Sequence, residues 1–285
     1  MKFENPELPE GVNVSHEHPL KEFSQLLLGV LVCVIVFLIV LHYSAQYLVK
    51  YIPFRYEVAM IERMGLFQES DVPLHEKRQQ AQLQALVDQL SNVMLEGEDV
   101  DIVVHYSNQD VVNAFATLGG HILIYQGLLD QLNSEQALAM VLAHEIAHVR
   151  LRHPISSLSK GLTLVTFSAL ITGVTGSSEA ELLINSSNNL GLLTFSREQE
   201  RQSDLLAAKA IHTYYGNIAG AKDLFATFEA LQQGPKYIPE IFMSHPHSDT
   251  RWQVLLDNAI NDSWVVEGLL SDIPIEIKGE SAISD

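Results

Sequence analysis

The chain has 285 residues, of which 47% are hydrophobic and 18% charged; it is too apolar for a disordered protein and too poor in cysteine for a disulfide-stapled one. Its 17 basic and 35 acidic residues give a formal net charge of -18, which repels phosphate backbones and argues against a nucleic-acid partner. The one cysteine, Cys33, can form no intrachain disulfide, so the sequence carries no mark of an oxidising compartment.

The amino-terminal part is expected to anchor the chain. Residues 1–22 are acidic and proline-dotted, and we expect a disordered tail. Residues 23–43 carry no charge and are long enough, as a helix, to cross a hydrocarbon layer of roughly 30 Å. A cleaved signal peptide is the alternative, but the preceding residues are acidic and no small-residue cleavage site follows. We expect a transmembrane helix at 23–43 that contacts membrane lipid.

The topology follows from the flanking charges and from a second apolar stretch. Residues 161–178 are also uncharged, but Thr, Ser and Gly dilute them, so we expect a buried or membrane-grazing helix, with a second span as the alternative. A small excess of basic residues after the first span leans weakly toward a cytoplasmic carboxyl side. We expect a single-pass protein of the bacterial inner membrane, with the side of its main domain left open.

The rest of the chain predicts one mixed domain. We expect a juxtamembrane linker at 44–72, the domain at 73–262 and a carboxy-terminal tail at 263–285. Leucines at helical spacing, then short runs of Val, Ile, Tyr and Phe, then further helical patterns predict a mostly α domain with a small β-sheet. The expected strands are 101–106, 111–116 and 121–125; the expected helices are 76–95, 134–152, a stretch from 156, 198–215, 218–232 and 248–258.

The helix at 134–152 carries the pattern His144-Glu145-x-x-His148. Residues four apart lie on one helix face, so both imidazoles can reach one Zn²⁺ at about 2.0–2.1 Å. Zinc lowers the pKa of the water that it binds to about 7, and Glu145 can take the proton as that water attacks a peptide carbonyl. The motif predicts a zinc-dependent peptidase; a helix whose histidines only hydrogen-bond is the alternative.

A catalytic zinc ion needs a third protein ligand. Glu200 and Asp204 are four residues apart and share a face of the next charged helix. If Glu200 ligates zinc, Asp204 is placed to accept the free ring N–H of a ligand histidine and to fix its orientation. Alone, this segment would indicate only a solvated helix face, but beside the histidine motif it predicts the third ligand.

These motifs, in order, resemble those of the membrane-associated zinc metallopeptidases that include HtpX, BepA, the Oma-type proteases and the CAAX prenyl endopeptidases, all gluzincins. The resemblance implies a zincin-like α+β metallopeptidase domain that binds one zinc ion per chain through His144, His148 and Glu200. It also implies Glu145 as the catalytic acid and base and Asp204 as the residue that supports the ligands. The matching segments are 113–116, 119–120, 125–129, 142–148, 196–204 and 245–251.

The resemblance also assigns roles outside the ligand set. It implies that Asn113, Ala114 and Phe115 form an edge strand with which an extended substrate pairs. It implies that His245 faces the active site, either stabilising the oxyanion or occupying the metal, with Arg251 supporting it. An ordinary loop histidine is the alternative for His245.

Two features depart from the resemblance. The family usually has Ala where this chain has Ser203, and several of its branches have more spans, which disfavours CAAX processing. Seven other histidines match no ligand spacing and are expected to be surface or structural: His16, His18, His75, His105, His121, His153 and His212.

The function expected from these motifs is that of a membrane-anchored zinc metalloendopeptidase. Its substrates would be proteins or peptides, cleaved in quality control of membrane or envelope proteins. A proteolytically silent or autoinhibited chaperone or adaptor of the same fold, held shut by His245, is the alternative. The intact Glu145 argues against loss of the chemistry.

Overall fold

The protein is described by a computed structural model that covers residues 19–49, 51–65, 67, 73–159, 194–233, 239–245 and 250–279. It divides into two compact units, 1–44 and 45–285, which are treated separately. The stretch at 161–178 and almost all of the expected amino-terminal tail lie outside the described residues.

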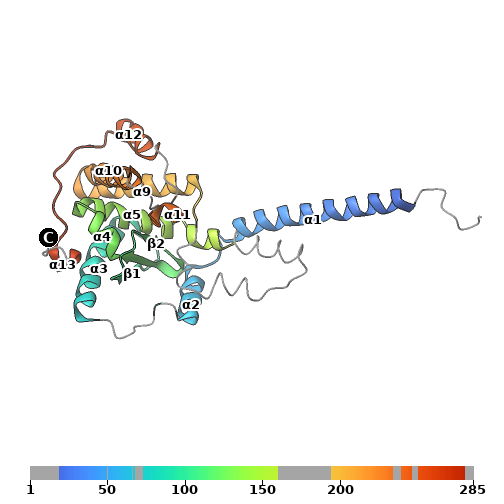
Figure 1. Ribbon diagram of the computed structural model, residues 1–285, viewed down its shortest axis with the longest axis horizontal. Helices are drawn as coiled ribbons and strands as arrows, with labels where there is room; N and C mark the ends of the chain where they lie inside the picture. The colour runs from blue at the N-terminus through green and yellow to red at the C-terminus, as the bar shows by residue number, and fades with distance from the viewer. Residues whose placement is uncertain are drawn as a thin grey trace, which may run out of the picture. The chain divides into compact units, whose positions relative to one another are not determined.

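Helix α1, Pro19–Val49, contains the apolar segment predicted to be a membrane span (Figure 1). Within it, Leu20–Leu41 is apolar and long enough to cross a bilayer, the one such stretch among the described residues, and none of it is buried. A signal sequence near the amino terminus would meet the same criteria. The apolar helix is therefore confirmed, and its insertion in a membrane stays a proposal.

The second unit contains a three-stranded sheet in the order β1-β3-β2. Strand β1 (Val103–Ser107) runs parallel to β3 (His121–Tyr125), and β2 (Ala114–Ala116) runs antiparallel to β3 at one edge. The turn η1, Leu118–Gly120, joins β2 to β3. Gly120 has a φ of +81°, and a Cβ there would overlap the backbone oxygen of Asp101, so the turn requires glycine.

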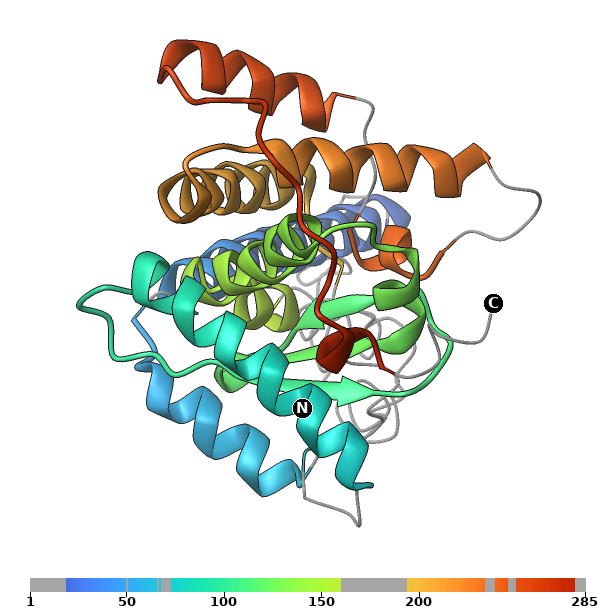
Figure 2. The same ribbon diagram turned by 90° about the vertical axis from the view of Figure 1, so that its left-hand side faces the viewer.

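Helix α5 occupies the centre of this unit, between the sheet and the helices α9 and α10 (Figures 1 and 2). Every residue from Gln136 to Val149 is buried, because α5 also contacts α3. The expected mostly α domain with one small sheet is confirmed. Its helices are α3 Leu74–Met94, α4 Gln126–Gln131, α5 Glu135–Arg150, α9 Arg197–Tyr215, α10 Ala219–Gln233, α11 Ile241–Ser244 and α12 Arg251–Asn261.

The expected linker at 44–72 contains a packed helix, α2, Phe54–Met64. Glu57 on α2 is 4% exposed, and its Oε1 lies 2.5 Å from Nη2 of Arg152, two residues after α5. Its Oε2 accepts a hydrogen bond of 3.4 Å from the backbone N–H of Gly119 in η1. Helix α2 is therefore bound to the end of α5 and to η1.

The segment at 263–279 also differs from the tail expected there. Val265 accepts a backbone hydrogen bond of 2.8 Å from Ile218, and the Ser271 N–H donates to Gln136 Oε1 at 2.9 Å. It ends in the short helix α13, Ile275–Lys278, where Ile277 is 4% exposed. These contacts join segments far apart in the chain and follow no helical or strand period, so sequence patterning does not reveal them.

Candidate active site

Helix α5 positions the first three site residues in the interior. Its N-cap Ser134 accepts a hydrogen bond of 3.1 Å from the backbone N–H of Ala137, which satisfies one of the free donors of the first turn. His144, Glu145 and His148 are 6%, 1% and 0% exposed. Burial of polar groups is costly unless they find partners, so this helix face requires a matching polar surface.

Helix α9 supplies that surface. It begins in a capping box, in which Ser196 Oγ accepts from the Gln199 N–H at 3.3 Å and Gln199 Oε1 accepts from the Ser196 N–H at 3.0 Å. The box fixes the start of α9, and with it the direction of Glu200 and Asp204 one and two turns later. Both carboxylates are buried, as expected of residues that face α5.

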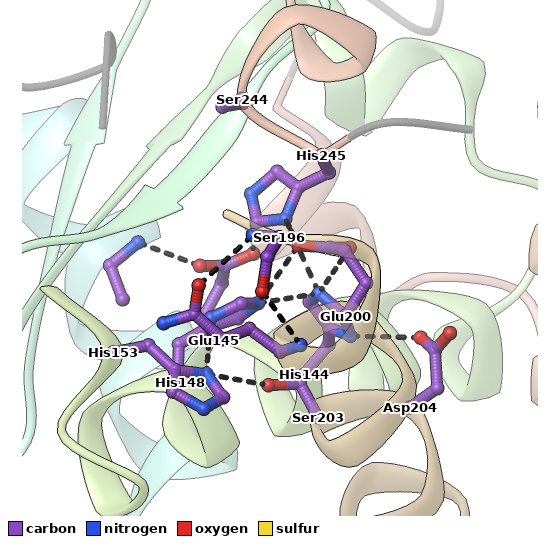
Figure 3. Close-up of polar contacts among 12 residues, drawn as sticks. His144, Glu145, His148, His153, Ser196, Glu200, Ser203, Asp204, Ser244 and His245 are labelled. Carbon is purple, nitrogen blue, oxygen red and sulfur yellow. Dashed lines mark hydrogen bonds and ion pairs between the residues drawn. The ribbon is translucent and has the colours of Figure 1, made fainter. Parts of the chain in front are cut away.

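Three side chains from α5 and α9 that could bind a metal ion converge on one point (Figure 3). His144 Nε2 lies 2.9 Å from His148 Nε2. Glu200 Oε2 lies 3.4 Å from His144 Nε2, and Glu200 Oε1 lies 3.4 Å from His148 Nε2. Glu200 Oε2 receives no well-directed hydrogen bond from the described residues, although Arg251 Nη1 is 3.1 Å away. Two imidazoles and a carboxylate with lone pairs aimed at one centre fit a cation, and they form a ligand set that catalytic zinc sites use.

The opposite ring nitrogens of the two histidines are held by other residues. His144 Nδ1 lies 3.0 Å from Asp204 Oδ1, and Arg251 holds Asp204 through two hydrogen bonds of 2.7 Å. His148 Nδ1 lies 3.0 Å from His153 Nδ1. Each Nε2 is thereby directed at the shared centre. The spacing of Glu200 and Asp204 had predicted the first of these contacts.

Glu145 and His245 lie on the remaining side of the centre (Figure 3). Glu145 Oε2 accepts a hydrogen bond of 2.6 Å from the Ala116 N–H, and its Oε1 is 3.4 Å from His245 Nε2. His245 Nδ1 lies 3.3 Å from His144 Nε2 and 3.1 Å from Glu200 Oε1. Donor atoms of His245 and of the three converging residues all lie within 4.8 Å of one another.

The pKa values of the buried groups at the site are shifted in different directions. Burial raises the pKa of Glu145, which suits a group that must accept a proton near neutral pH. Burial alone would raise the pKa of Asp204 too, but the Arg251 guanidinium and the His144 ring together outweigh it and lower that pKa to about 2. Burial lowers the pKa of His148, which favours the neutral form that can offer a lone pair.

A cavity beside the centre is largely apolar. It opens between α5 and α10 and reaches His144, Glu145 and His245. Its apolar wall lies next to the polar groups of the centre. Its apolar lining consists of Met140, Val141, Leu224, Phe228, Ile241 and Phe242.

The predicted substrate strand lies at a sheet edge. Ala114 and Phe115 belong to the edge strand β2, and Asn113 comes directly before it; all three are buried. The backbone of Val112 accepts a hydrogen bond of 3.1 Å from Ile241 of α11, so this helix covers the start of the edge. Pairing of a substrate with the strand remains a proposal.

Two contacts of His148 were missed from the sequence. His153, expected to be surface or structural, is 4% exposed and touches His148, and the Phe195 ring centroid lies 3.9 Å from that of His148. His153 follows the end of α5, where helical spacing no longer predicts neighbours. Phe195 had one available signal, since an apolar residue just before an N-cap often packs on its helix.

Comparison with known proteins places this site among the metallopeptidases. The sequence model of peptidase family M48 matches residues 74–259. The beta-barrel assembly-enhancing protease of Yersinia pestis is 27% identical over 160 residues, which cover 50% of this chain and 32% of that protein. Metalloprotease LoiP of Escherichia coli (strain K12) is 28% identical, covering 59% and 66%. Mitochondrial metalloendopeptidase OMA1 of Schizosaccharomyces pombe is 26% identical, covering 54% and 45%.

Proposed function

Because the chain belongs to peptidase family M48 and is therefore a metalloprotease, we propose that it is a membrane-anchored zinc metalloendopeptidase. The observation that carries the proposal is the convergence of His144, His148 and Glu200 on one centre, with Glu145 beside it. A zinc ion held by the three ligands would activate a water and polarise the substrate carbonyl.

Glu145 is proposed to move the proton in peptide hydrolysis. Its Oε2 is held by the Ala116 N–H at 2.6 Å, which leaves Oε1 on the side of the centre. Oε1 takes the proton of the attacking water, and Glu145 then returns it to the nitrogen of the cleaved peptide bond. General acid and base catalysis of this kind contributes about 100- to 10,000-fold to the rate.

An extended peptide is the proposed substrate, bound along β2 at Asn113 to Phe115. Its backbone would add a strand to the sheet edge. Because the Ala116 N–H at the end of β2 already holds Glu145, the scissile bond would lie close to the catalytic carboxylate. Segments of unfolded or unassembled proteins meet this requirement for extended backbone.

We place the protein in quality control at a membrane. Leu20–Leu41 would serve as a single-pass anchor, as its length and composition allow. Of the similar proteins, one is named for beta-barrel assembly and another as mitochondrial. The chain spans only 32% of the Yersinia pestis protein. Membrane and envelope proteins are therefore proposed as substrates from the chemistry of the site and from the proposed membrane anchor, and not from that relative.

An autoinhibited resting state is the second candidate, supported by the position of His245. This side chain is 3% exposed and brings Nδ1 to 3.3 Å from His144 Nε2, within the cluster of ligand atoms. A histidine there would occupy the metal until substrate displaces it. Arg251 lies behind the cluster, where it supports Asp204 and Glu200.

The two candidates are separated by zinc content and casein hydrolysis of the full-length chain in detergent. The endopeptidase proposal expects one zinc per chain and hydrolysis that Glu145→Gln abolishes without loss of zinc. Zinc-loaded wild-type chain that cleaves no better than Glu145→Gln would support the silent or autoinhibited alternative.

A further inference from the structure

The zinc-ligand candidate His148 touches a histidine and a serine that the reaction does not use. His153 Nδ1 lies 3.0 Å from His148 Nδ1, and Ser203 Oγ lies 3.4 Å from the same His153 nitrogen (Figure 3). All three side chains are buried, with exposures of 0% for His148, 4% for His153 and 0% for Ser203. They come from α5, from the start of the helical segment that follows the turn at 151–152, and from α9, so the contact joins both ligand-bearing helices.

The direction of these hydrogen bonds follows from the chemistry of imidazole. If His148 binds a metal through Nε2, its proton must be on Nδ1, and that N–H donates to the neighbouring nitrogen. His153 Nδ1 is then an acceptor, so the proton of a neutral His153 is on Nε2. The Ser203 hydroxyl, at 3.4 Å, can share the single lone pair of His153 Nδ1 as a weaker second donor, which is compatible with the same tautomer.

The two ligand histidines are thereby held by different kinds of acceptor. Asp204, an ionised carboxylate bound by Arg251, holds His144, whereas a neutral imidazole holds His148. The Phe195 ring packs on His148 at 3.9 Å between centroids and restricts ring rotation, but it offers no acceptor for the ring N–H. Among the described contacts, His153 is the one that can fix which nitrogen of His148 faces the metal centre.

We propose that His153, supported by the Ser203 hydroxyl, is a positioning residue that orients His148 Nε2 toward the metal. The inference rests on the proposed function, since it takes His148 to be a zinc ligand. Loss of an outer hydrogen-bond partner of a ligand typically weakens metal binding about 10- to 100-fold. Loss of one neutral hydrogen bond, as with Ser203, weakens it about two- to tenfold.

The test measures the zinc dissociation constant of the full-length chain by competition with a chelator at fixed pH. We expect His153→Leu to weaken binding about 10- to 100-fold. His153→Asn, whose side-chain oxygen can stand near the lost Nδ1, should recover most of that loss, and Ser203→Ala should show the smaller effect. Ser91→Ala is the matched control, because its buried hydroxyl has no hydrogen-bond partner in the described part of the chain, and its affinity should equal that of the wild type.

His148→Ala separates the failure of this inference from that of the function. If His148→Ala loses zinc while His153→Leu and Ser203→Ala bind it as the wild type does, the positioning role is wrong and the ligand set stands. Zinc retained by His148→Ala would overturn both. If His153→Leu does not fold, nitrogen-15 NMR of the zinc-loaded wild type decides: a His153 ring protonated on Nε2 supports the role, and one protonated on Nδ1 refutes it.

Discussion

Asp204→Asn removes the charge from a buried ion pair while keeping the shape of the side chain. The Asp204 and Arg251 side chains are 4% and 10% exposed and are joined by two hydrogen bonds of 2.7 Å. The pKa of Asp204 falls from 3.8 to about 2, so ionisation in the folded state contributes about 2 to 3 kcal/mol at neutral pH. Breaking a buried pair by removing one partner costs about 3–5 kcal/mol. Because Arg251 keeps Glu200 at 3.1 Å, we expect the lower figure, about 3 kcal/mol.

Thermal unfolding of the metal-free full-length chain in detergent measures this cost. At about 2–4 °C of Tm per kcal/mol for a domain of this size, Asp204→Asn should lower Tm by about 6–12 °C. The control Asp257→Asn changes an exposed aspartate on α12 and should shift stability by less than about 0.5 kcal/mol. A double-mutant cycle with Arg251→Met should show a combined loss smaller than the sum of the two single losses. Equal Tm values for the two aspartate variants would refute the electrostatic argument.

Three further sets of substitutions test the packing of α2, the role of His245 and the membrane topology. Glu57→Ala removes the carboxylate paired with Arg152 and the acceptor of the Gly119 N–H, so chemical denaturation should show a loss of about 1–3 kcal/mol. A loss no larger than that of the exposed-site control Glu62→Ala would contradict the packing of α2. If His245 occupies the centre at rest, His245→Ala should raise the basal rate of casein hydrolysis at unchanged zinc content. A fall in that rate of about 100- to 1,000-fold would instead assign His245 to stabilisation of the oxyanion, and an unchanged rate would exclude both roles. In a background with Cys33→Ser, Lys160→Cys and Glu179→Cys should be labelled from the same side of the membrane, and labelling from opposite sides would show that 161–178 crosses it.

The sequence allowed prediction of the parts of the site that depend on helical spacing. His144 and His148 share a face because they are four residues apart, and the same spacing linked Glu200 to Asp204 across one turn of α9. The structure brings these four side chains together and confirms the mostly α domain with its small sheet.

What the sequence did not reveal depends on contacts between distant segments. His153 reaches His148 only because the chain turns at the end of α5, and Glu57 meets Arg152 across nearly a hundred residues. The segment at 263–279 is held by single hydrogen bonds such as that between Ser271 and Gln136, which leave no periodic pattern. Such contacts are set by tertiary packing, so local patterning does not specify them.

We propose above all that His144, His148 and Glu200 together hold one zinc ion. Zinc content per chain, measured by mass spectrometry on the purified full-length protein and its alanine variants, tests it most directly. Wild type should carry one zinc, each of the three variants should lose it, and Glu198→Ala should keep it, since Glu198 is exposed and paired with Arg201 at 2.6 Å. Zinc retained by Glu200→Ala but lost by Glu198→Ala, or a wild-type chain that binds no zinc, would contradict the account.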